Sequence, residues 1–380
     1  MRIVFYSGTA SWGKLDPELD GKKNRMFGGG ERALLTYAYG LSDRGHDVTV
    51  VAPITEEKEY NGVKWMQRPH PAVGPSWQAE ECDVFIASET PESICHARRS
   101  KYRILECQCN HYSLAPYVTQ IDAAVARSEW HQNHLLRQEP LFHQVPMSVI
   151  GNGVSPERYA DWQKNEGKRT KDMRVIYSSS PDRGLNHLLR IWPLVREQLP
   201  KATLHVYYEV NNFIKNNRAQ MSLVGEMALD IEQDIRQEGV KAHGPVNQDQ
   251  LARAQMQSSL MVYPCDTIVP TEGFGITVAE SIAAGCSVLT TDTDAFYELW
   301  NDHTHMMRPP PAPAVRGEYG PLDDDWAKAI VELLQDRAVH AEKRADARAA
   351  LLEQHTWERV LDQWEELLFG LAGVKEPAPS

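Results

Sequence analysis

Residues 263–290 read YPCDTIVPTEGFGITVAESIAAGCSVLT, and this stretch decides the fold of the chain. The apolar run that ends at Tyr263 is typical of a buried strand, and the Ala-rich segment that ends at Gly285 is typical of a helix with a glycine cap. Glycines lie where this helix begins, so an anionic or hydroxyl-rich ligand can approach its unpaired backbone N–H groups. The stretch therefore predicts a strand, a ligand-binding loop and a helix.

Two glutamates, Glu272 and Glu280, add carboxylates to this predicted ligand-binding segment. If the intervening residues are largely helical, a rise of ~1.5 Å per residue separates them by roughly 12 Å along the helix axis. A retaining pair of carboxylates that shuttles a proton needs closer contact than that. The spacing suits two hydroxyl-bearing parts of one elongated ligand, such as the hexose and the ribose of a nucleotide sugar.

Length and composition predict two domains and exclude several classes of protein. The 380 residues are enough for two hydrophobic cores, and the net charge of −12 argues against a general nucleic-acid binder. The six cysteines lack Cys-x-x-Cys spacing, so we expect reduced thiols and no metal site. No signal peptide or membrane-spanning apolar run is evident in the sequence, and we therefore expect a cytoplasmic protein.

The first part of the chain predicts a βαβ unit with a glycine-rich loop. A strand at Arg2–Tyr6 is followed by the run Gly28-Gly29-Gly30, a helix that ends at Arg44, and a buried strand at Val48–Ala52. Parallel strands place such a loop at the ligand-binding edge of the sheet. The spacing lacks the G-x-G-x-x-G pattern of dinucleotide-binding proteins. A surface loop without a ligand is the alternative interpretation.

Further strands and helices alternate along the chain, which is typical of an open α/β fold. His111 follows a predicted strand at Tyr102–Cys107, where the carboxyl end of a strand faces a ligand site in such folds. A second alternating run begins with a strand at Arg174–Tyr177, and the loop after it contains Arg183 before the next helix. Anions favour helix N-termini supported by arginine, so this loop is a candidate phosphate site.

These segments occur in an order that resembles the retaining GT-B glycosyltransferases of the large family 4. Glu272-Gly-Phe-Gly275, followed after seven residues by Glu280, resembles their E-x7-E motif. The run GGGER at 28–32 and the later RGHDVTVV resemble the segment that opens those enzymes. The sequence VIGNGV at 149–154 resembles the hinge between their domains, and Arg183-Gly184 lies where they usually have Lys-Gly.

The resemblance implies an α/β fold of the GT-B type, with two Rossmann-like domains that face each other across a cleft. Residues 1–153 would form the acceptor-side domain, and residues 154–356 the domain that binds the nucleotide-sugar donor. A helix over 357–371 would pack back on the first domain. The implied activity is that of a hexosyltransferase, which moves a sugar from a UDP- or GDP-linked donor to an unidentified acceptor, with retention and without a metal.

The resemblance also implies the site residues. Glu272, His111 and Arg183 would be catalytic: Glu272 and His111 contact the transferred sugar, and Arg183 is the main cation for the diphosphate because Ser178 takes about the place of a second arginine. Glu280 would bind the ribose. The donor-binding residues would be Gly28, Gly29, Gly30, Arg183, Gly244, Glu272, Gly273, Phe274, Gly275 and Glu280. The nucleotide sugar is a co-substrate, and no other cofactor or metal is expected.

Other functions stay open on the sequence alone. The same fold suits a nucleotide-sugar epimerase or a sugar phosphorylase, and a non-catalytic sugar-nucleotide-binding protein is a further alternative. The acceptor is expected to be a glycan, a lipid-linked molecule, a protein or a small molecule. Peripheral membrane contact is less favoured than a solvated charged face for the basic cluster His96, Arg98, Arg99, Lys101 and Arg103.

Overall fold

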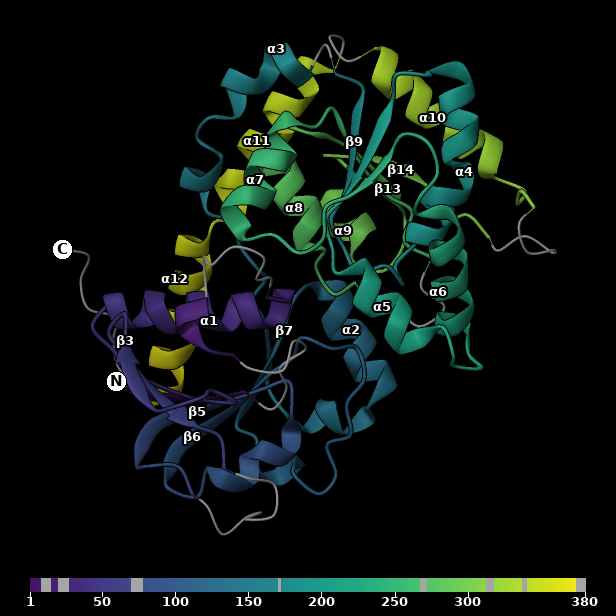
Figure 1. Ribbon diagram of the computed structural model, residues 1–380. Coiled ribbons are helices and arrows are strands. Elements are labelled where there is room, and N and C mark those ends of the chain that lie inside the picture. Colours follow the sequence, from purple (N-terminus) through teal and green to yellow (C-terminus); the bar gives the residue numbers. More distant parts are fainter. Residues whose placement is uncertain are drawn as a thin grey trace. The chain divides into compact units, whose positions relative to one another are not determined.

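The computed structural model describes residues 1–7, 15–19, 27–69, 78–169, 172–266, 272–311, 318–336 and 340–373. The described residues form two compact units. The first unit contains the described residues up to Gly153 together with those from His355 onward, and the second contains those in Val154–Gln354. Figure 1 follows the chain through both units in colours from purple to yellow.

The first unit is built on an eight-stranded sheet with the order β3-β4-β2-β1-β5-β6-β7-β8. Neighbouring strands are parallel except for the antiparallel edge pair β3 and β4. The central strands are buried runs rich in β-branched residues, as expected of a parallel sheet covered on both faces. The strands are β1 (Arg2–Ser7), β2 (Asp47–Ala52), β3 (Lys58–Tyr60), β4 (Val63–Gln67), β5 (Cys82–Ser88), β6 (Ser100–Glu106), β7 (Ala123–Ala126) and β8 (Met147–Val149).

Helices of the first unit come from both ends of the chain. They are α1 (Gly29–Asp43), α2 (Glu129–Gln138) and α12 (Trp357–Ala372), with the short 3-10 helices η1 (Pro17–Leu19), η3 (Pro91–His96), η4 (Val118–Gln120) and η5 (Pro140–Gln144). Thr356 caps the start of α12: its side chain accepts a hydrogen bond from the Arg359 backbone and so satisfies an N–H of the first turn. It packs against α1, and Tyr37 of α1 lies 5.3 Å from Trp364, measured between ring centroids.

Two glycines allow this close packing of α12. A side chain at Gly40 of α1 would collide with the methyl groups of Leu361, and one at Gly153 would collide with the backbone of Thr356 and Trp357. The residue that ends the first unit's main segment therefore lies directly against the start of its last helix.

The second unit has a six-stranded sheet with the order β11-β10-β9-β12-β13-β14, and all neighbouring pairs are parallel. Its strands are β9 (Arg174–Tyr177), β10 (Thr203–Val206), β11 (Val240–Ala242), β12 (Leu260–Tyr263), β13 (Ser287–Thr291) and β14 (His305–Met307). In chain order this arrangement is 3-2-1-4-5-6, the order of Rossmann-like sheets. The α/β class predicted from the sequence is thus confirmed.

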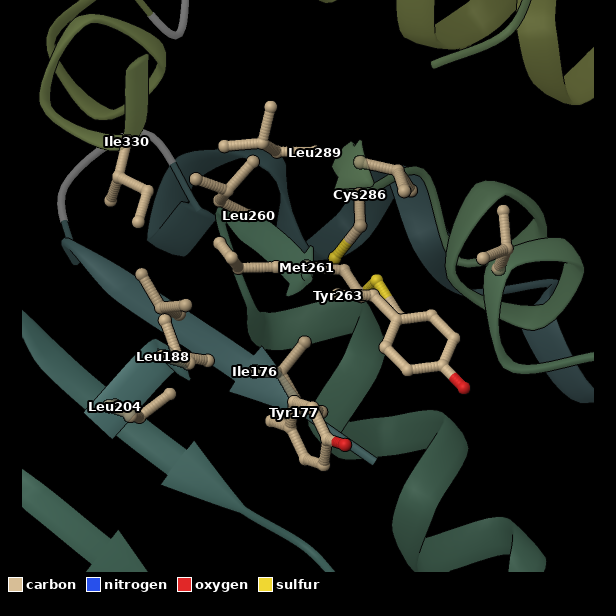
Figure 2. Packing of buried hydrophobic residues seen from close by; sticks show 14 of the residues in the cluster. Ile176, Tyr177, Leu188, Leu204, Leu260, Met261, Tyr263, Cys286, Leu289 and Ile330 are labelled. Carbon is tan, nitrogen blue, oxygen red and sulfur yellow. The ribbon is translucent and has the colours of Figure 1, made fainter. Parts of the chain in front are cut away.

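Helices cover both faces of this sheet, with α7, α8 and α11 on one side and α4 and α10 on the other (Figure 1). The helices are α3 (Glu166–Arg169), α4 (Leu185–Gln198), α5 (Val210–Asn217), α6 (Leu223–Asp234), α7 (Gln248–Gln257), α8 (Ile276–Ala283), α9 (Phe296–Trp300), α10 (Asp323–Gln335) and α11 (Ala341–Gln354), with the 3-10 helices η6 (Pro156–Tyr159) and η7 (Trp162–Asn165). Figure 2 shows Leu204 and Leu260 of two strands together with Leu188 of α4 and Ile330 of α10, and the strand register places Ile176 on the other face.

The contact of Gly153 with α12 generates a prediction for stability. Gly153→Ala should lower the free energy of unfolding of the first unit by about 1–3 kcal/mol, because backbone atoms cannot move aside for the new methyl group. Gly370→Ala is the matched control: this helical glycine of α12 has open space around it, so alanine should stabilise the unit by about 0.5–1 kcal/mol. Urea denaturation of both variants measures the difference, and equal effects would contradict the packing.

Candidate functional site

The loops that follow β9 and β12 form the candidate site of the second unit. These two strands are neighbours in the sheet, and the chain leaves them in opposite directions, toward β10 and toward β13. Ligands of open α/β sheets bind at the carboxyl ends of two such strands. The loop after β9 contains Ser178–Gly184, and the loop after β12 leads to Glu272, although residues 267–271 of it lie outside the described residues.

The side chains of Arg183 and Glu272 form an ion pair between these two loops. The Glu272 side chain is 5% exposed and that of Arg183 is 31% exposed, so the carboxylate is buried and the arginine side chain is partly accessible. Burial alone would lower the pKa of Arg183, but the attraction of Glu272 outweighs it and raises this pKa well above its ordinary value. The site thus presents a permanently charged cation held by a buried carboxylate.

Glu272 is fixed through its side chain and its backbone. The Tyr263 hydroxyl donates to Glu272 Oε1 at 2.8 Å, the same oxygen that Arg183 contacts. The Glu272 backbone N–H donates to Asp294 Oδ2 at 3.1 Å, and its carbonyl accepts from the Ala295 backbone N–H at 3.2 Å. Asp294 has a φ of 54°, a left-handed conformation that a short polar side chain tolerates best. Sequence reasoning missed both Tyr263 and Asp294 as supporting residues.

The loop that carries Arg183 is held by a second tyrosine and a glycine. The Tyr177 hydroxyl lies 2.7 Å from the carbonyl oxygen of Ser180 and 3.0 Å from that of Arg183. Gly184 has a φ of 90°, and a side chain there would collide with the Pro264 carbonyl group. Helix α4 begins at the next residue, so Arg183 lies at a helix N-terminus, where anions are favoured.

Ser178, which stands about where the resemblance places a second arginine, has a hydrogen-bond partner in the same unit. Its Oγ lies 2.7 Å from Thr277 Oγ1 in the first turn of α8. The contact ties the loop after β9 to the helix that follows the glycine segment.

The glycine segment after Glu272 is packed tightly. Gly275 has a φ of 80°, and a side chain there would collide with the Phe296 ring. The Phe274 ring belongs to the core, and its carbonyl oxygen accepts a hydrogen bond of 2.8 Å from Trp300 Nε1. Gly273 is buried beside them. These contacts fix the backbone that leads from Glu272 into α8.

Glu280 and Gly244 complete the predicted residues of the second unit. Glu280 lies in α8 and is half-buried. Gly244 follows β11 with a φ of 73°, next to a stack in which the rings of Tyr207 and His243 are nearly parallel with 4.4 Å between their centroids. His205 extends this stack, and burial lowers its pKa to about 3 and also lowers that of His243. The imidazoles are therefore neutral at neutral pH.

The predicted glycine run of the first unit lies beside a carboxylate. Gly28 precedes α1 and its backbone N–H donates to Glu31 Oε2 at 2.7 Å, while Gly29 and Gly30 are the first helical residues rather than loop. A side chain at Gly30 would collide with the Glu89 carboxylate. Glu89 follows β5 with a φ of 67°, and sequence reasoning missed it although it directly follows a predicted buried strand.

His111 is exposed in the loop after β6, and α2 anchors that loop. His131 Nε2 lies 2.9 Å from the carbonyl oxygen of Cys109, and His134 Nε2 lies 3.0 Å from that of Asn110. Burial lowers the pKa of His131 to about 4, so this imidazole is neutral and donates from Nε2. The loop therefore holds His111 on a fixed backbone within the first unit.

Other features of the described residues bear on metals, membranes and charge. No group of His, Cys, Asp or Glu side chains in these ranges is arranged to hold a metal ion. Among the described helices, none is both long and apolar enough to cross a membrane.

In the basic cluster, Lys101 pairs with Asp83 at 2.6 Å, Arg103 donates to a backbone carbonyl, and His96 is buried against Tyr6. The cluster is therefore not a continuous patch of free cations.

Comparison with known proteins finds similar glycosyltransferases. Residues 174–336 match the family described as Glycosyl transferases group 1. Over 359 residues the chain is 23% identical to a phosphatidyl-myo-inositol mannosyltransferase from Mycolicibacterium smegmatis, with 83% of each chain covered. Sucrose-phosphate synthase from Thermosynechococcus elongatus superposes with a TM-score of 0.71 at 13% identity, over 98% of this chain and 100% of that one. The fold is GT-B.

Further GT-B structures are similar over different lengths. Anabaena HepE in complex with UDP-glucose has a TM-score of 0.63 at 15% identity and covers 97% of this chain and 100% of its own. TarM has a TM-score of 0.53 at 16% identity, and the similarity spans 75% of this chain but only 54% of TarM. The family match and the mannosyltransferase relative support a glycosyltransferase, and the matched residues include Arg183, Glu272 and Glu280.

The left-handed glycines of the second unit give a test of how tightly the site is built. Gly244→Ala should lower the free energy of unfolding by about 1–2 kcal/mol, the cost of a left-handed alanine in open space. Gly184→Ala should cost at least about 1 kcal/mol more, because it adds overpacking against the Pro264 carbonyl group. Chemical denaturation compares the two variants, and equal losses would show that the two loops are not in close contact.

Proposed function

We propose that this protein is a retaining glycosyltransferase of family 4, which transfers a sugar from a UDP- or GDP-linked donor to a hydroxyl-bearing acceptor without a metal. The observation that carries the proposal is the Arg183–Glu272 ion pair at the carboxyl ends of β9 and β12. The family match over residues 174–336 supports it, because that match spans both members of the pair.

The ion pair offers two kinds of recognition side by side. The Arg183 guanidinium, on a partly exposed side chain at the N-terminus of α4, suits the oxygens of a diphosphate. The Glu272 carboxylate suits hydroxyl groups, which donate hydrogen bonds to it. A nucleotide sugar is a ligand of this kind, with an anionic diphosphate next to a polyhydroxyl sugar. In this proposal Glu280 accepts hydrogen bonds from the ribose, and Gly244 lies near the base, beside the neutral stack of Tyr207 and His243.

The proposed reaction is a substitution on one face of the anomeric carbon. The bond from that carbon to the diphosphate oxygen breaks while the acceptor oxygen forms its bond on the same face, and the departing diphosphate oxygen receives the acceptor proton. Arg183 and the α4 N-terminus stabilise the charge that develops on the diphosphate. Glu272 and His111 contact the transferred sugar and orient its reacting carbon. No nucleophile from the protein takes part.

The binding and transfer of a donor test the proposal directly. A panel of UDP- and GDP-linked sugars is first screened by thermal denaturation, since a donor at 100 times its Kd stabilises the protein by about 2.7 kcal/mol. The stabilising donor is then followed by NMR with candidate acceptors, and retention at the anomeric carbon is the expected result. Phosphate-dependent turnover would indicate a phosphorylase, conversion of the free nucleotide sugar an epimerase, and binding without turnover a non-catalytic protein.

Arg183→Ala should weaken the binding of the nucleoside diphosphate by about 1.5–3 kcal/mol, because a charge-assisted hydrogen bond is lost. Arg190→Ala is the matched control. Arg190 lies in α4, the helix that begins just after Arg183, and it pairs with Asp323 at 2.8 Å rather than with Glu272. That variant should lose stability and keep its affinity for UDP or GDP. Titration calorimetry measures the affinity of both variants for UDP or GDP. An unchanged affinity in Arg183→Ala would mean that another cation holds the phosphates.

The two glutamates should separate by kinetic role. Glu280→Gln should chiefly raise the donor KM, because the ribose is chemically unchanged in the reaction, and Glu272→Gln should chiefly lower kcat, because it misorients the reacting sugar. Steady-state kinetics with the donor found in the screen measures this split. The affinity for the sugar-free nucleoside diphosphate should fall in Glu280→Gln and change little in Glu272→Gln, and the opposite pattern would refute these roles.

A further inference from the structure

The buried hydroxyl of Tyr263 has no role in the proposed reaction, yet it lies in the candidate site. Tyr263 is the last residue of β12 and is fully buried, and a buried tyrosine hydroxyl needs hydrogen-bond partners. It donates to Glu272 Oε1 at 2.8 Å and lies 2.8 Å from Ser179 Oγ. Since the single phenolic proton points to Glu272, the hydroxyl accepts its second hydrogen bond from Ser179. Burial raises the pKa of Tyr263 well above its ordinary value, so the donor is retained.

We infer that Tyr263 is a positioning residue for sugar transfer, which sets the rotation of the Glu272 carboxylate about its last side-chain bond. The inference rests on the proposed function of Glu272. Rotation about this bond has only broad preferences of its own, so hydrogen bonds must fix it. Tyr263 and Arg183 both contact Oε1, which directs the second carboxylate oxygen, Oε2, to the hydroxyl groups of the donor sugar.

Tyr177 gives an internal comparison for this inference. It ends β9, the strand beside β12, it is equally buried, and its ring meets that of Tyr263 edge to face with 5.9 Å between centroids. Figure 2 shows both hydroxyl groups at the margin of the same apolar cluster. The Tyr177 hydroxyl, however, contacts the carbonyl oxygens of Ser180 and Arg183. It therefore supports the loop that would bind the diphosphate, whereas Tyr263 supports the residue that would bind the sugar.

The two tyrosines should differ in kinetics although each variant removes one buried hydroxyl. Tyr263→Phe should lower kcat about tenfold or more, with the donor KM and the affinity for UDP or GDP changed by less than about twofold. Tyr177→Phe should instead weaken the binding of the nucleoside diphosphate and raise the donor KM. Ser179→Ala should lower kcat by a smaller factor than Tyr263→Phe, because it acts through the tyrosine.

A double-variant cycle separates positioning from a general loss of structure. In the Glu272→Gln background, Tyr263→Phe should lower kcat and kcat/KM little further, because both changes disable the same group. The loss of kcat/KM from Tyr177→Phe should instead multiply with the loss from Glu272→Gln, because the two changes act on different parts of the donor. If Tyr263→Phe does not fold, the same cycle is run with Ser179→Ala. Three outcomes would each overturn the inference. The first is that neither Tyr263→Phe nor Ser179→Ala changes kcat, and the second is that their loss of kcat multiplies with that of Glu272→Gln. The third is that Tyr263→Phe lowers nucleotide affinity as much as Tyr177→Phe does.

The wild-type protein distinguishes a failure of this inference from a failure of the proposed function. A wild-type chain that binds neither UDP nor GDP and turns over no nucleotide sugar refutes the proposed function, and the inference falls with it. A wild-type chain that transfers sugar and depends on Glu272 for kcat, but not on Tyr263, refutes the inference alone.

Discussion

The ion pair between Arg183 and Glu272 is the interaction on which the candidate site depends. A carboxylate that is 5% exposed is stabilised by a cation, since an unpaired buried charge is costly. The pair therefore constrains the two loops that follow β9 and β12. The left-handed Gly184 lets one loop approach Pro264, and Asp294 holds the backbone of the other. Each of these features brings the two charges together at the sheet edge where ligands bind.

Arginine suits this position better than lysine for a physical reason. A guanidinium has five N–H donors in a planar fork, so it can hold Glu272 through one nitrogen and still direct others to an anion. The ammonium group of lysine is a point charge that would have to share its donors between the two. The chain has Arg183-Gly184 where the resemblance expects Lys-Gly, and here the cation is already paired with a carboxylate. In the proposed function, arginine can bind the diphosphate without releasing Glu272.

Much of the fold and part of the site were predictable from the sequence. Buried β-branched runs separated by helical segments predict parallel α/β sheets, and the segment from Glu272 to Gly275 predicts a ligand loop at a helix start. The support that Tyr263 gives to Glu272 was not predictable. Its ring completes the apolar pattern of the strand, and the residue that its hydroxyl contacts lies after a loop. The left-handed Glu89 and Asp294 depend on tertiary contacts that no local sequence pattern encodes.

A second ion pair shows what separates a structural pair from a ligand site. Arg127 and Glu106 of the first unit lie 2.7 Å apart, and each side chain is 1% exposed. Arg127 also donates to the Tyr37 hydroxyl and to the carbonyl oxygens of Cys107 and Ile150, so most of its donors are used within the protein. Among the residues that the structure describes, the Arg183 guanidinium bonds to Glu272 alone, and the Arg183 side chain is 31% exposed. These two chemically similar pairs thus differ in the donors that their cations have left, and the pair at the strand ends of the second unit is the one whose cation can bond to a ligand as well.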